Sequence, residues 1–312
     1  MTAPEQAEAP DSKRSPLAAA VMRAVSGFSG DVGVCAIHAS SGRRILFHAD
    51  RMFPAASTVK LFVLVALYQA SAQGKLDLER RMEVTNRDRC KGSGVLAHLD
   101  DGLRPTLRDL ATLMMMVSDN TAANLLIDVI GVERIRDIIE KAGLEHTRFE
   151  GPIDFTVFAR DQSAMGSSTP LDMARFMMRL YKNELLPAEE TARVINVLRI
   201  QKYIEPMRRM LPVDPYAREL GEPEPVWVAS KTGSLDGVRV EVGLVHADGH
   251  KGKRHKSGRA TKSVASRLGP WGNAWALSVM TNRGSERRVS SENEAVRIIA
   301  QVSRAVFDAW SV

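Results

Sequence analysis

Residues 57–68 read STVKLFVLVALY, a serine and a lysine three positions apart at the start of a long apolar run. Pro54 stands just before the stretch, and proline is common around helix starts. Residues three apart share one face of a helix, so Lys60 should project beside Ser57. The stretch therefore predicts a buried helix whose first turn pairs a hydroxyl nucleophile with an amine.

Two further short motifs follow this stretch, SDN at residues 118–120 and KTG at residues 231–233. Each motif has an ordinary explanation when taken alone. A Ser-x-x-Lys pair occurs by chance, SDN could be a helix end followed by a new N-cap, and KTG could end any strand. None of these explanations accounts for all three motifs in this order, so the sequence favours one catalytic site built from them.

The composition is that of an ordinary globular protein, with 312 residues, 44% hydrophobic and 26% charged. This length suits one large domain or two subdomains. The formal net charge of +6 is concentrated in residues 250–267, which hold seven Lys and Arg and no acid. This basic stretch argues poorly for a nucleic-acid-binding protein. We predict a mobile hairpin loop there; the alternative is that it docks an acidic partner, a carrier protein or nucleic acid.

The cysteines, the N-terminal segment, the apolar runs and the histidines indicate the compartment and the need for a cofactor. The two cysteines, Cys35 and Cys90, leave one disulfide open, but such sparse usage suits a reducing compartment. Residues 1–15 are rich in Ala, Pro and Glu; they read as disordered and lack a signal-peptide core. The apolar runs are shorter than a membrane span. We therefore predict a cytoplasmic protein without membrane association, and no metal or cofactor, since the histidines show no zinc spacing.

Strand patterns fall at both ends of the chain and helical patterns fill the middle. The expected strands are 32–38, 44–48, 226–232, 238–246 and 275–281. The expected helices are 16–27, 57–72, 107–117, 121–129, 132–142, 170–182, 188–200 and 290–310. We predict an α/β (α+β) fold, an antiparallel sheet from both termini flanked by helices, with residues 57–203 inserted as a helical subdomain. The sheet subdomain would comprise residues 16–56 and 204–312, with 250–267 as an insertion.

The three motifs, in this order, resemble those of class A β-lactamases and penicillin-binding proteins. Longer segments at residues 118–126, 168–174 and 231–245 are also similar to that family. The resemblance extends from about residue 20 to residue 310. It implies a β-lactamase or transpeptidase-like fold and catalysis through an acyl-enzyme.

The resemblance also implies roles for single residues. Ser57 would be the acylated nucleophile and Lys60 its general base, with a pKa lowered by burial and by Lys231. Ser118 would relay a proton toward the leaving nitrogen. Asn120 would hold the amide of the substrate's side chain.

Further residues would bind the substrate at the KTG strand. Lys231 and Thr232 would bind a substrate carboxylate, and the backbone amides of Ser57 and Ser234 would form the oxyanion hole. Arg239 is a second candidate for binding the carboxylate; the alternative is a strand arginine that faces solvent.

The chain departs from the family in the loop that carries the deacylating glutamate. In class A enzymes this glutamate activates water and lies five residues after an arginine that here is Arg148. The fifth residue on is Ile153, and no Glu-x-x-Leu-Asn pattern occurs in residues 149–165. The usual salt-bridge positions of the loop hold Gly151 and Gly166.

Asp154 follows Ile153 and is the nearest replacement for the missing glutamate. Its side chain is one methylene shorter, so the water would have to sit differently; the alternative is an ordinary loop aspartate. We therefore expect Ser57 to be acylated and β-lactam turnover to be slow. Cys90, flanked by cations that would lower its pKa, is expected near the mouth of the site, either accessible or as a plain loop cysteine.

These observations predict a serine hydrolase acting through an acyl-enzyme on Ser57. The substrate would be a small amide, ester or β-lactam carrying a carboxylate. A true class A β-lactamase and an acyltransferase of small-molecule metabolism, with an amine or thiol in place of water, remain alternatives. A peptidase is less favoured because no export signal is seen, and a non-catalytic binding protein is disfavoured by the intact motifs.

Overall fold

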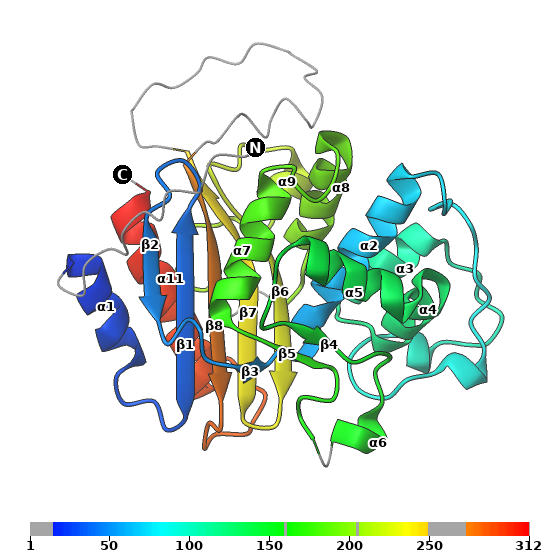
Figure 1. The fold of residues 1–312 in the computed structure, drawn as a ribbon, viewed down its shortest axis with the longest axis horizontal. Coiled ribbons are helices and arrows are strands. Elements are labelled where there is room, and N and C mark those ends of the chain that lie inside the picture. Colours follow the sequence, from blue (N-terminus) through cyan, green and yellow to red (C-terminus); the bar gives the residue numbers. More distant parts are fainter. Residues whose placement is uncertain (1–14, 159–160, 204–205, 249–272, 312) are drawn as a thin grey trace, which may run out of the picture.

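The computed structural model describes residues 15–158, 161–203, 206–248 and 273–311. Its main sheet has five strands in the order β2-β1-β8-β7-β6, with every neighbouring pair antiparallel (Figure 1). The strands are β1 Asp31–His38, β2 Arg44–Phe47, β6 Val226–Leu235, β7 Val238–Ala247 and β8 Ala274–Asn282. The predicted antiparallel sheet, joined from the two ends of the chain, is confirmed.

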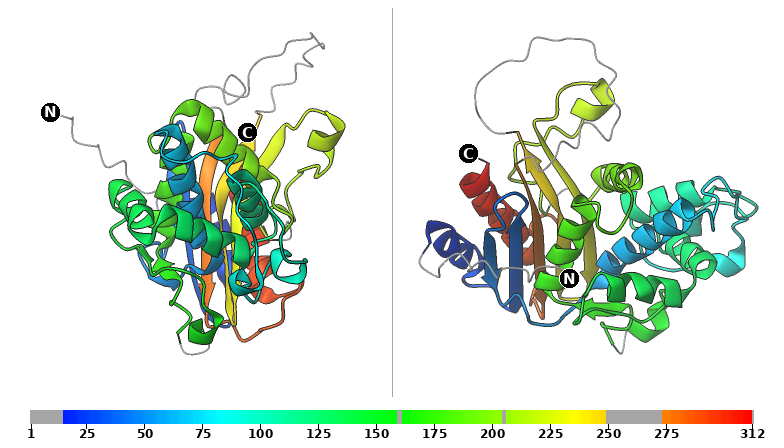
Figure 2. Two further views of the ribbon diagram at one scale, coloured as in Figure 1. Left: turned by 90° about the vertical axis from the view of Figure 1, so that its right-hand side faces the viewer. Right: turned by 45° about the horizontal axis from the view of Figure 1, so that its top comes forward.

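Helices cover both faces of this sheet (Figures 1 and 2). Helices α1 Pro16–Val25 and α11 Glu294–Trp310 pack on each other and on one face, and α7 Pro170–Tyr181 packs on the other. Successive side chains of a strand point to opposite faces, so β6 serves both cores. Val228 joins the cluster under α11, whereas Ala229 joins the larger cluster toward the helical part.

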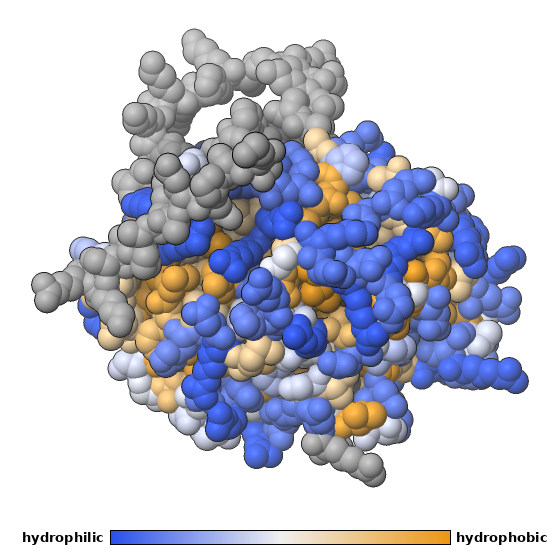
Figure 3. Space-filling model, in the orientation of Figure 1, coloured by the Kyte–Doolittle hydropathy of each residue, from blue (hydrophilic) through white to orange (hydrophobic). Residues whose placement is uncertain are grey.

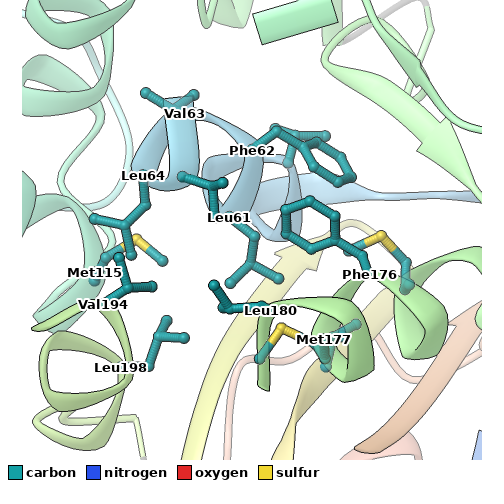
Figure 4. Packing of buried hydrophobic residues seen from close by; sticks show 14 of the residues in the cluster. Leu61, Phe62, Val63, Leu64, Met115, Phe176, Met177, Leu180, Val194 and Leu198 are labelled. Atoms are coloured by element: carbon teal, nitrogen blue, oxygen red, sulfur yellow. The ribbon is translucent and has the colours of Figure 1, made fainter. Parts of the chain in front are cut away.

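Helix α2, Lys60–Ala72, is the centre of the larger core, as the sequence predicts. Residues 60–68 are all buried. Phe62 meets Phe176 of α7 edge to face, with ring centroids 4.8 Å apart, and Leu64 faces Met115 (Figure 4). Burying a side chain of this size contributes about 1.5–3 kcal/mol, so α2 is firmly fixed. A fixed α2 in turn fixes the turn that carries Ser57.

The remaining described elements are helices, 3-10 turns and a small second sheet. They are α3 Leu107–Met116, α4 Asn120–Ile130, α5 Val132–Lys141, α8 Ala188–Arg199, the short helices α6 Phe155–Phe158 and α9 Ala217–Leu220, and the 3-10 turns η1 Ala56–Val59, η2 Asn86–Asp88 and η3 Leu96–His98. A small sheet orders β3 Phe53–Pro54, β5 Gly166–Ser168 and β4 Arg148–Phe149. It ties the loop after Arg148 to the segment that enters the Ser57 turn.

Two predicted boundaries differ from the structure. Ser57 lies in the 3-10 turn η1, not in the first turn of α2. The strand expected at 226–232 continues to Leu235, so the KTG motif lies inside β6 and pairs with β7. The division into subdomains stays a prediction, and both the N-terminal residues 1–14 and the basic stretch 250–267 lie outside the described residues. Within the described ranges, no helix is both long and apolar enough to cross a bilayer.

Candidate active site

The turn that carries Ser57 is pressed against β6. Ala56 has a φ of +46°, in the left-handed region that costs free energy for an alanine. A Cβ on Gly233 would lie 2.9 Å from the Ser57 backbone nitrogen and 2.7 Å from the Val240 side chain. Only glycine lets β6 approach so closely, and the Ser57 amide therefore lies beside the strand that carries Ser234.

Lys60 is buried behind Ser57 and is fully hydrogen-bonded. Its Nζ donates to Ser118 O at 2.7 Å, to Ser118 Oγ at 3.2 Å and to Asn120 Oδ1 at 2.7 Å. Burial, together with the charge of Lys231, holds the pKa of Lys60 well below its usual value, although Asp119 opposes this. The structure thus joins the first two motifs through a lysine that loses its proton easily.

The SDN triplet links the base to the mouth of the site. Ser118 has a φ of +56°, between α3 and α4. Asp119 caps α4 through Ala122 N, as the structural interpretation of the motif predicts, and its other oxygen accepts from Val95 N at 2.6 Å. Asn120 Nδ2 donates to Lys91 O at 2.8 Å. The triplet therefore holds the loop at residues 91–95 against the site.

Lys231 is buried on β6 and lies near a buried carboxylate. Its Nζ donates to Thr232 O at 2.7 Å. Burial lowers the pKa of Lys231 to about 7, and Glu241 opposes that shift. Burial raises the pKa of Glu241 to about 7 as well. Glu241 accepts from Ser230 Oγ at 2.6 Å and from Met207 N at 2.7 Å.

A chain of hydrogen bonds runs from Glu241 to Thr232. Gln201 Nε2 donates to Ser230 Oγ at 3.1 Å, and Gln201 Oε1 accepts from Thr232 N at 3.0 Å and Thr232 Oγ1 at 3.1 Å. A hydroxyl has one proton, so Thr232 must release Gln201 before it can donate to a substrate carboxylate. Sequence reasoning missed Glu241 and Gln201; the available signal was one acid within an otherwise apolar strand.

A cavity of about 530 Å³ brings the predicted residues together. Its polar lining includes Ser57, Ser118, Thr232, Ser234 and Arg239. Its remaining wall includes Gly92, Ser93, Phe155, Tyr203, Pro206 and Val289. Three further motif residues are buried behind the lining: Lys60, Asn120 and Lys231. Lys60 is hydrogen-bonded to Ser118 of the lining, and Lys231 is hydrogen-bonded to Thr232. The three motifs therefore converge on one concave site, the usual setting for small-molecule chemistry.

Arg239 is buried rather than facing solvent, which excludes the alternative considered for it. Its Nη1 donates to Leu235 O and Val238 O, both at 2.7 Å. Its Nη2 donates to Arg287 O at 3.2 Å and Arg288 O at 2.9 Å. Burial lowers its pKa. Arg239 lines the cavity, but these four carbonyls occupy its guanidinium, so it serves first to hold the strand ends.

Asp154 is not brought to Ser57. Its side chain is fully exposed, and Oδ1 accepts from Thr156 N at 2.8 Å and Thr156 Oγ1 at 2.7 Å. These bonds lower the pKa of Asp154. The carboxylate thus stabilises the start of α6, and Asp154 is not among the residues lining the cavity. This geometry fits the loop-aspartate interpretation.

Cys90 settles one open alternative and corrects one expectation from the sequence. Cys35 and Cys90 are both free, so the disulfide left open does not form. The pKa of Cys90 is raised, whereas the sequence predicted that neighbouring cations would lower it. Burial of the thiol raises the pKa by more than the charge of Lys60 lowers it. The thiol donates to Ile153 O at 3.4 Å. Cys90 therefore holds the loop at the position where the glutamate is missing.

Comparison with known proteins places these motifs in a family. The model of the Beta-lactamase enzyme family matches residues 16–252. A curated relative, β-lactamase OXY-2 of Klebsiella oxytoca, is 27% identical over 172 residues, which is 54% of this chain. The chain spans only 59% of the length of that relative.

Solved structures share the fold over nearly the whole chain. A β-lactamase from Sphaerobacter thermophilus DSM 20745 superposes with a TM-score of 0.77 at 29% identity, covering 94% of this chain and 96% of that one. PBP-A superposes with a TM-score of 0.74 at 23% identity, covering 96% and 98%. A mutant of PBP-A, solved as an acyl-enzyme complex with penicillin G, gives a TM-score of 0.73 at 23% identity, covering 97% and 98%.

Proposed function

Because this chain belongs to the β-lactamase enzyme family, we propose that it is a serine hydrolase that forms an acyl-enzyme on Ser57. The observation that carries the proposal is the environment of Lys60. Its amine contacts the Ser118 hydroxyl, and burial together with Lys231 lowers its pKa. A lowered pKa makes the neutral amine easier to form, and a neutral amine can act as a general base toward a hydroxyl.

Acylation would use the hydrogen bond that joins Lys60 to Ser118. Ser57 Oγ attacks the substrate carbonyl carbon and gives its proton to Lys60 Nζ. The proton passes through Ser118 Oγ, 3.2 Å from Nζ, to the leaving nitrogen or oxygen as its bond to the carbonyl breaks. The backbone amides of Ser57 and Ser234 would stabilise the negative charge on the carbonyl oxygen.

The substrate class follows from the polar end of the cavity. Thr232 lines it, and Lys231 lies buried next to Thr232 on the same strand. A pKa near 7 leaves Lys231 partly protonated at neutral pH, and a bound carboxylate would favour the protonated form. An amide, ester or β-lactam with a carboxylate fits this end. The penicillin G acyl-enzyme of the PBP-A mutant supports a β-lactam as one such ligand.

Slow deacylation is part of the proposal. Ile153 stands where the glutamate is expected, and the carboxylate next to it in the sequence, that of Asp154, accepts hydrogen bonds from Thr156. Without a carboxylate to activate water, the Ser57 ester would persist. The same feature favours a second candidate function, acyl transfer, in which an amine or thiol nucleophile takes the place of water.

Intact-protein mass spectrometry with benzylpenicillin tests the proposal, with wild type beside Ser57→Ala and Asp154→Asn. We expect a lasting adduct on wild type and Asp154→Asn, and none on Ser57→Ala. Rapid consumption of penicillin without a lasting adduct would make the protein an efficient β-lactamase and refute slow deacylation. Intact penicillin and unlabelled protein would contradict the β-lactam substrate, and ester and amide probes would then test the acyl-enzyme itself.

A further inference from the structure

Gln201 is a polar side chain enclosed within the protein beside the strand that carries the KTG motif. Hydrophilic residues cover much of the molecular surface in view, where water shares their hydrogen bonds (Figure 3). Gln201, in contrast, has only 2% of its surface exposed. A buried amide must find its hydrogen-bond partners inside the protein. Both ends of this amide have partners, and these partners lie on β6.

The carbonyl of Gln201 holds Thr232 twice at the outer edge of β6. This edge has no neighbouring strand among the described residues, because β6 is the last strand in the order of its sheet. Gln201 Oε1 accepts from Thr232 N at 3.0 Å and from Thr232 Oγ1 at 3.1 Å. The first bond satisfies a backbone group that the sheet leaves open. The second takes the only proton of a hydroxyl whose residue lines the cavity.

Glu241 fixes which end of the amide faces Thr232. Ser230 Oγ donates its single proton to Glu241 Oε1 at 2.6 Å, so its oxygen is left to accept, and Gln201 Nε2 donates to it at 3.1 Å. Met207 N donates to the other carboxyl oxygen at 2.7 Å. Because Nε2 is committed to Ser230, Gln201 presents its carbonyl to Thr232. The buried carboxyl group thus acts on the substrate end of the cavity through two side chains.

A substrate carboxylate has to compete with Gln201 for the hydroxyl of Thr232. A carboxylate only accepts hydrogen bonds, so it gains one from Thr232 Oγ1 only when that proton leaves Gln201 Oε1. Gln201 loses one of its two bonds in this exchange and keeps Thr232 N, so the strand stays in place. A neutral ester gains much less from the hydroxyl, because hydrogen bonds to charged groups are the stronger ones. The competition therefore acts mainly on ligands that carry a negative charge.

We propose that Gln201 is a positioning residue that lowers the affinity of the site for carboxylates by competing for the hydroxyl of Thr232. This inference rests on the proposed function, since it assumes that Thr232 binds the substrate carboxylate. A hydrogen bond between neutral groups changes an equilibrium constant by roughly two- to tenfold. Removing the carbonyl of Gln201 should therefore strengthen carboxylate binding by that factor, although it removes a buried contact. The same competition favours release of the product that keeps the carboxylate.

The test compares benzylpenicillin with its methyl ester, which differ only in the methyl group on the carboxyl and in the charge that it removes. Equilibrium dissociation constants are measured in a Ser57→Ala background, where Ser57 cannot be acylated. Gln201→Met removes the carbonyl and keeps the length of the side chain. Gln201→Asn keeps an amide that ends one methylene earlier, and it is the second variant should Gln201→Met fail to fold. Gln73→Met is the matched control, because Gln73 is exposed and does not line the cavity.

A double-mutant cycle with Thr232→Val separates the proposed competition from a general disturbance of the site. Valine keeps the shape of threonine without its hydroxyl, so Gln201 has no hydroxyl to withhold from the ligand in that background. Thermal unfolding of each variant records the cost in stability. We expect such a cost for Gln201→Met, because Ser230 and Thr232 each lose a partner.

We expect Gln201→Met to strengthen the binding of benzylpenicillin roughly two- to tenfold and to leave the binding of the ester unchanged. Beside Thr232→Val it should change the binding of neither ligand. Gln201→Asn should act in the same direction as Gln201→Met by a smaller factor, and Gln73→Met should have no effect. Unchanged or weaker binding of benzylpenicillin, an equal change for both ligands, or the same gain beside Thr232→Val would overturn the inference.

Failure of the proposed function gives different results. Equal binding of acid and ester by the Ser57→Ala protein would show that the site selects no carboxylate, which contradicts the proposed substrate class and the inference with it. The expected response to Gln201→Met, without an adduct on Ser57 in the otherwise unchanged enzyme, would contradict only the proposed reaction.

Discussion

The side-chain amide of Asn124 holds the backbone of Ile153 from both sides. Asn124 Oδ1 accepts from Ile153 N at 2.7 Å, and Asn124 Nδ2 donates to Ile153 O at 3.0 Å. Two such bonds from a rigid helix fix the position of residue 153 in the loop. The loop is therefore well placed at the point where a catalytic carboxylate is absent.

Ile153→Glu should shorten the lifetime of the acyl-enzyme at least tenfold. Asn124 would hold the new residue in place, and Cys90, which contacts Ile153 O, lies close enough to Lys60 for their charges to interact. The variant should also be less stable, because Ile153 is 5% exposed and a carboxylate is costly to bury. Ile153→Gln is the control, with similar length but no charge. An unchanged lifetime in Ile153→Glu would show that this position does not reach the ester.

Lys231→Ala should move the acidic limb of the acylation rate to higher pH. In our proposal Lys60 is the general base and works only after losing its proton, so the rate should rise with pH through the pKa of Lys60. The charge of Lys231 lowers that pKa, so removing it must raise the pKa. The measurement is the pH at which the acylation rate reaches half its maximum. The maximum rate itself is not compared, because Lys231 also binds substrate in our proposal and its loss would lower that rate. Lys141→Ala, with a side chain 68% exposed on α5, should leave the midpoint in place.

Glu241→Gln should make stability less dependent on pH between about 4.5 and 7. Burial raises the pKa of Glu241 from 4.5 to about 7, so in this range the folded state binds more protons than the unfolded state. Wild-type stability therefore falls as pH rises through this window, by roughly 3 kcal/mol from this group. Denaturant unfolding at pH 5 and pH 8 measures the difference. Parallel behaviour of wild type and variant would show that Glu241 is ionised normally.

Gly233→Ala should reduce the rate of acylation much more than it reduces the stability of the fold. The new Cβ would lie 2.9 Å from Ser57 N and would push the turn away from β6. Gly30→Ala is the control, since its Cβ would meet the backbone at Arg283 at 2.7 Å, outside the cavity lining. Thermal unfolding and penicillin acylation are measured together. Equal loss of both quantities in the two variants would contradict a local effect on Ser57.

The sequence predicts those features that depend on neighbours along the chain. The apolar run after Lys60 requires a buried helix. Thr106 and Asp109, a Thr-x-x-Asp pattern just before an apolar run, cap α3 through hydrogen bonds of 2.9 and 3.0 Å. The convergence of Ser57, Ser118 and Thr232 on one cavity follows from the motif order through a family resemblance. Spacing alone could not have placed them together.

The features that the sequence did not predict depend on contacts between distant segments. Glu241 reaches Gln201 only through Ser230, which requires the pairing of β6 with β7 and the docking of the segment after α8. The guanidinium of Arg239 is occupied by carbonyls near residues 287 and 288. The carboxylate of Asp154 turns to Thr156 because a helix start offers it donors.

The pairing of β1 with β8 has a consequence for how the protein folds. Asp31 lies opposite Asn282, so the central pair of the sheet joins the two ends of the described chain. During synthesis β1 must wait for β8, while the helices between them can form from local contacts. Until then β1 exposes an unpaired apolar edge, a template for wrong pairing with other chains. Slow closure of this sheet should therefore limit the rate at which the reactive serine turn is assembled.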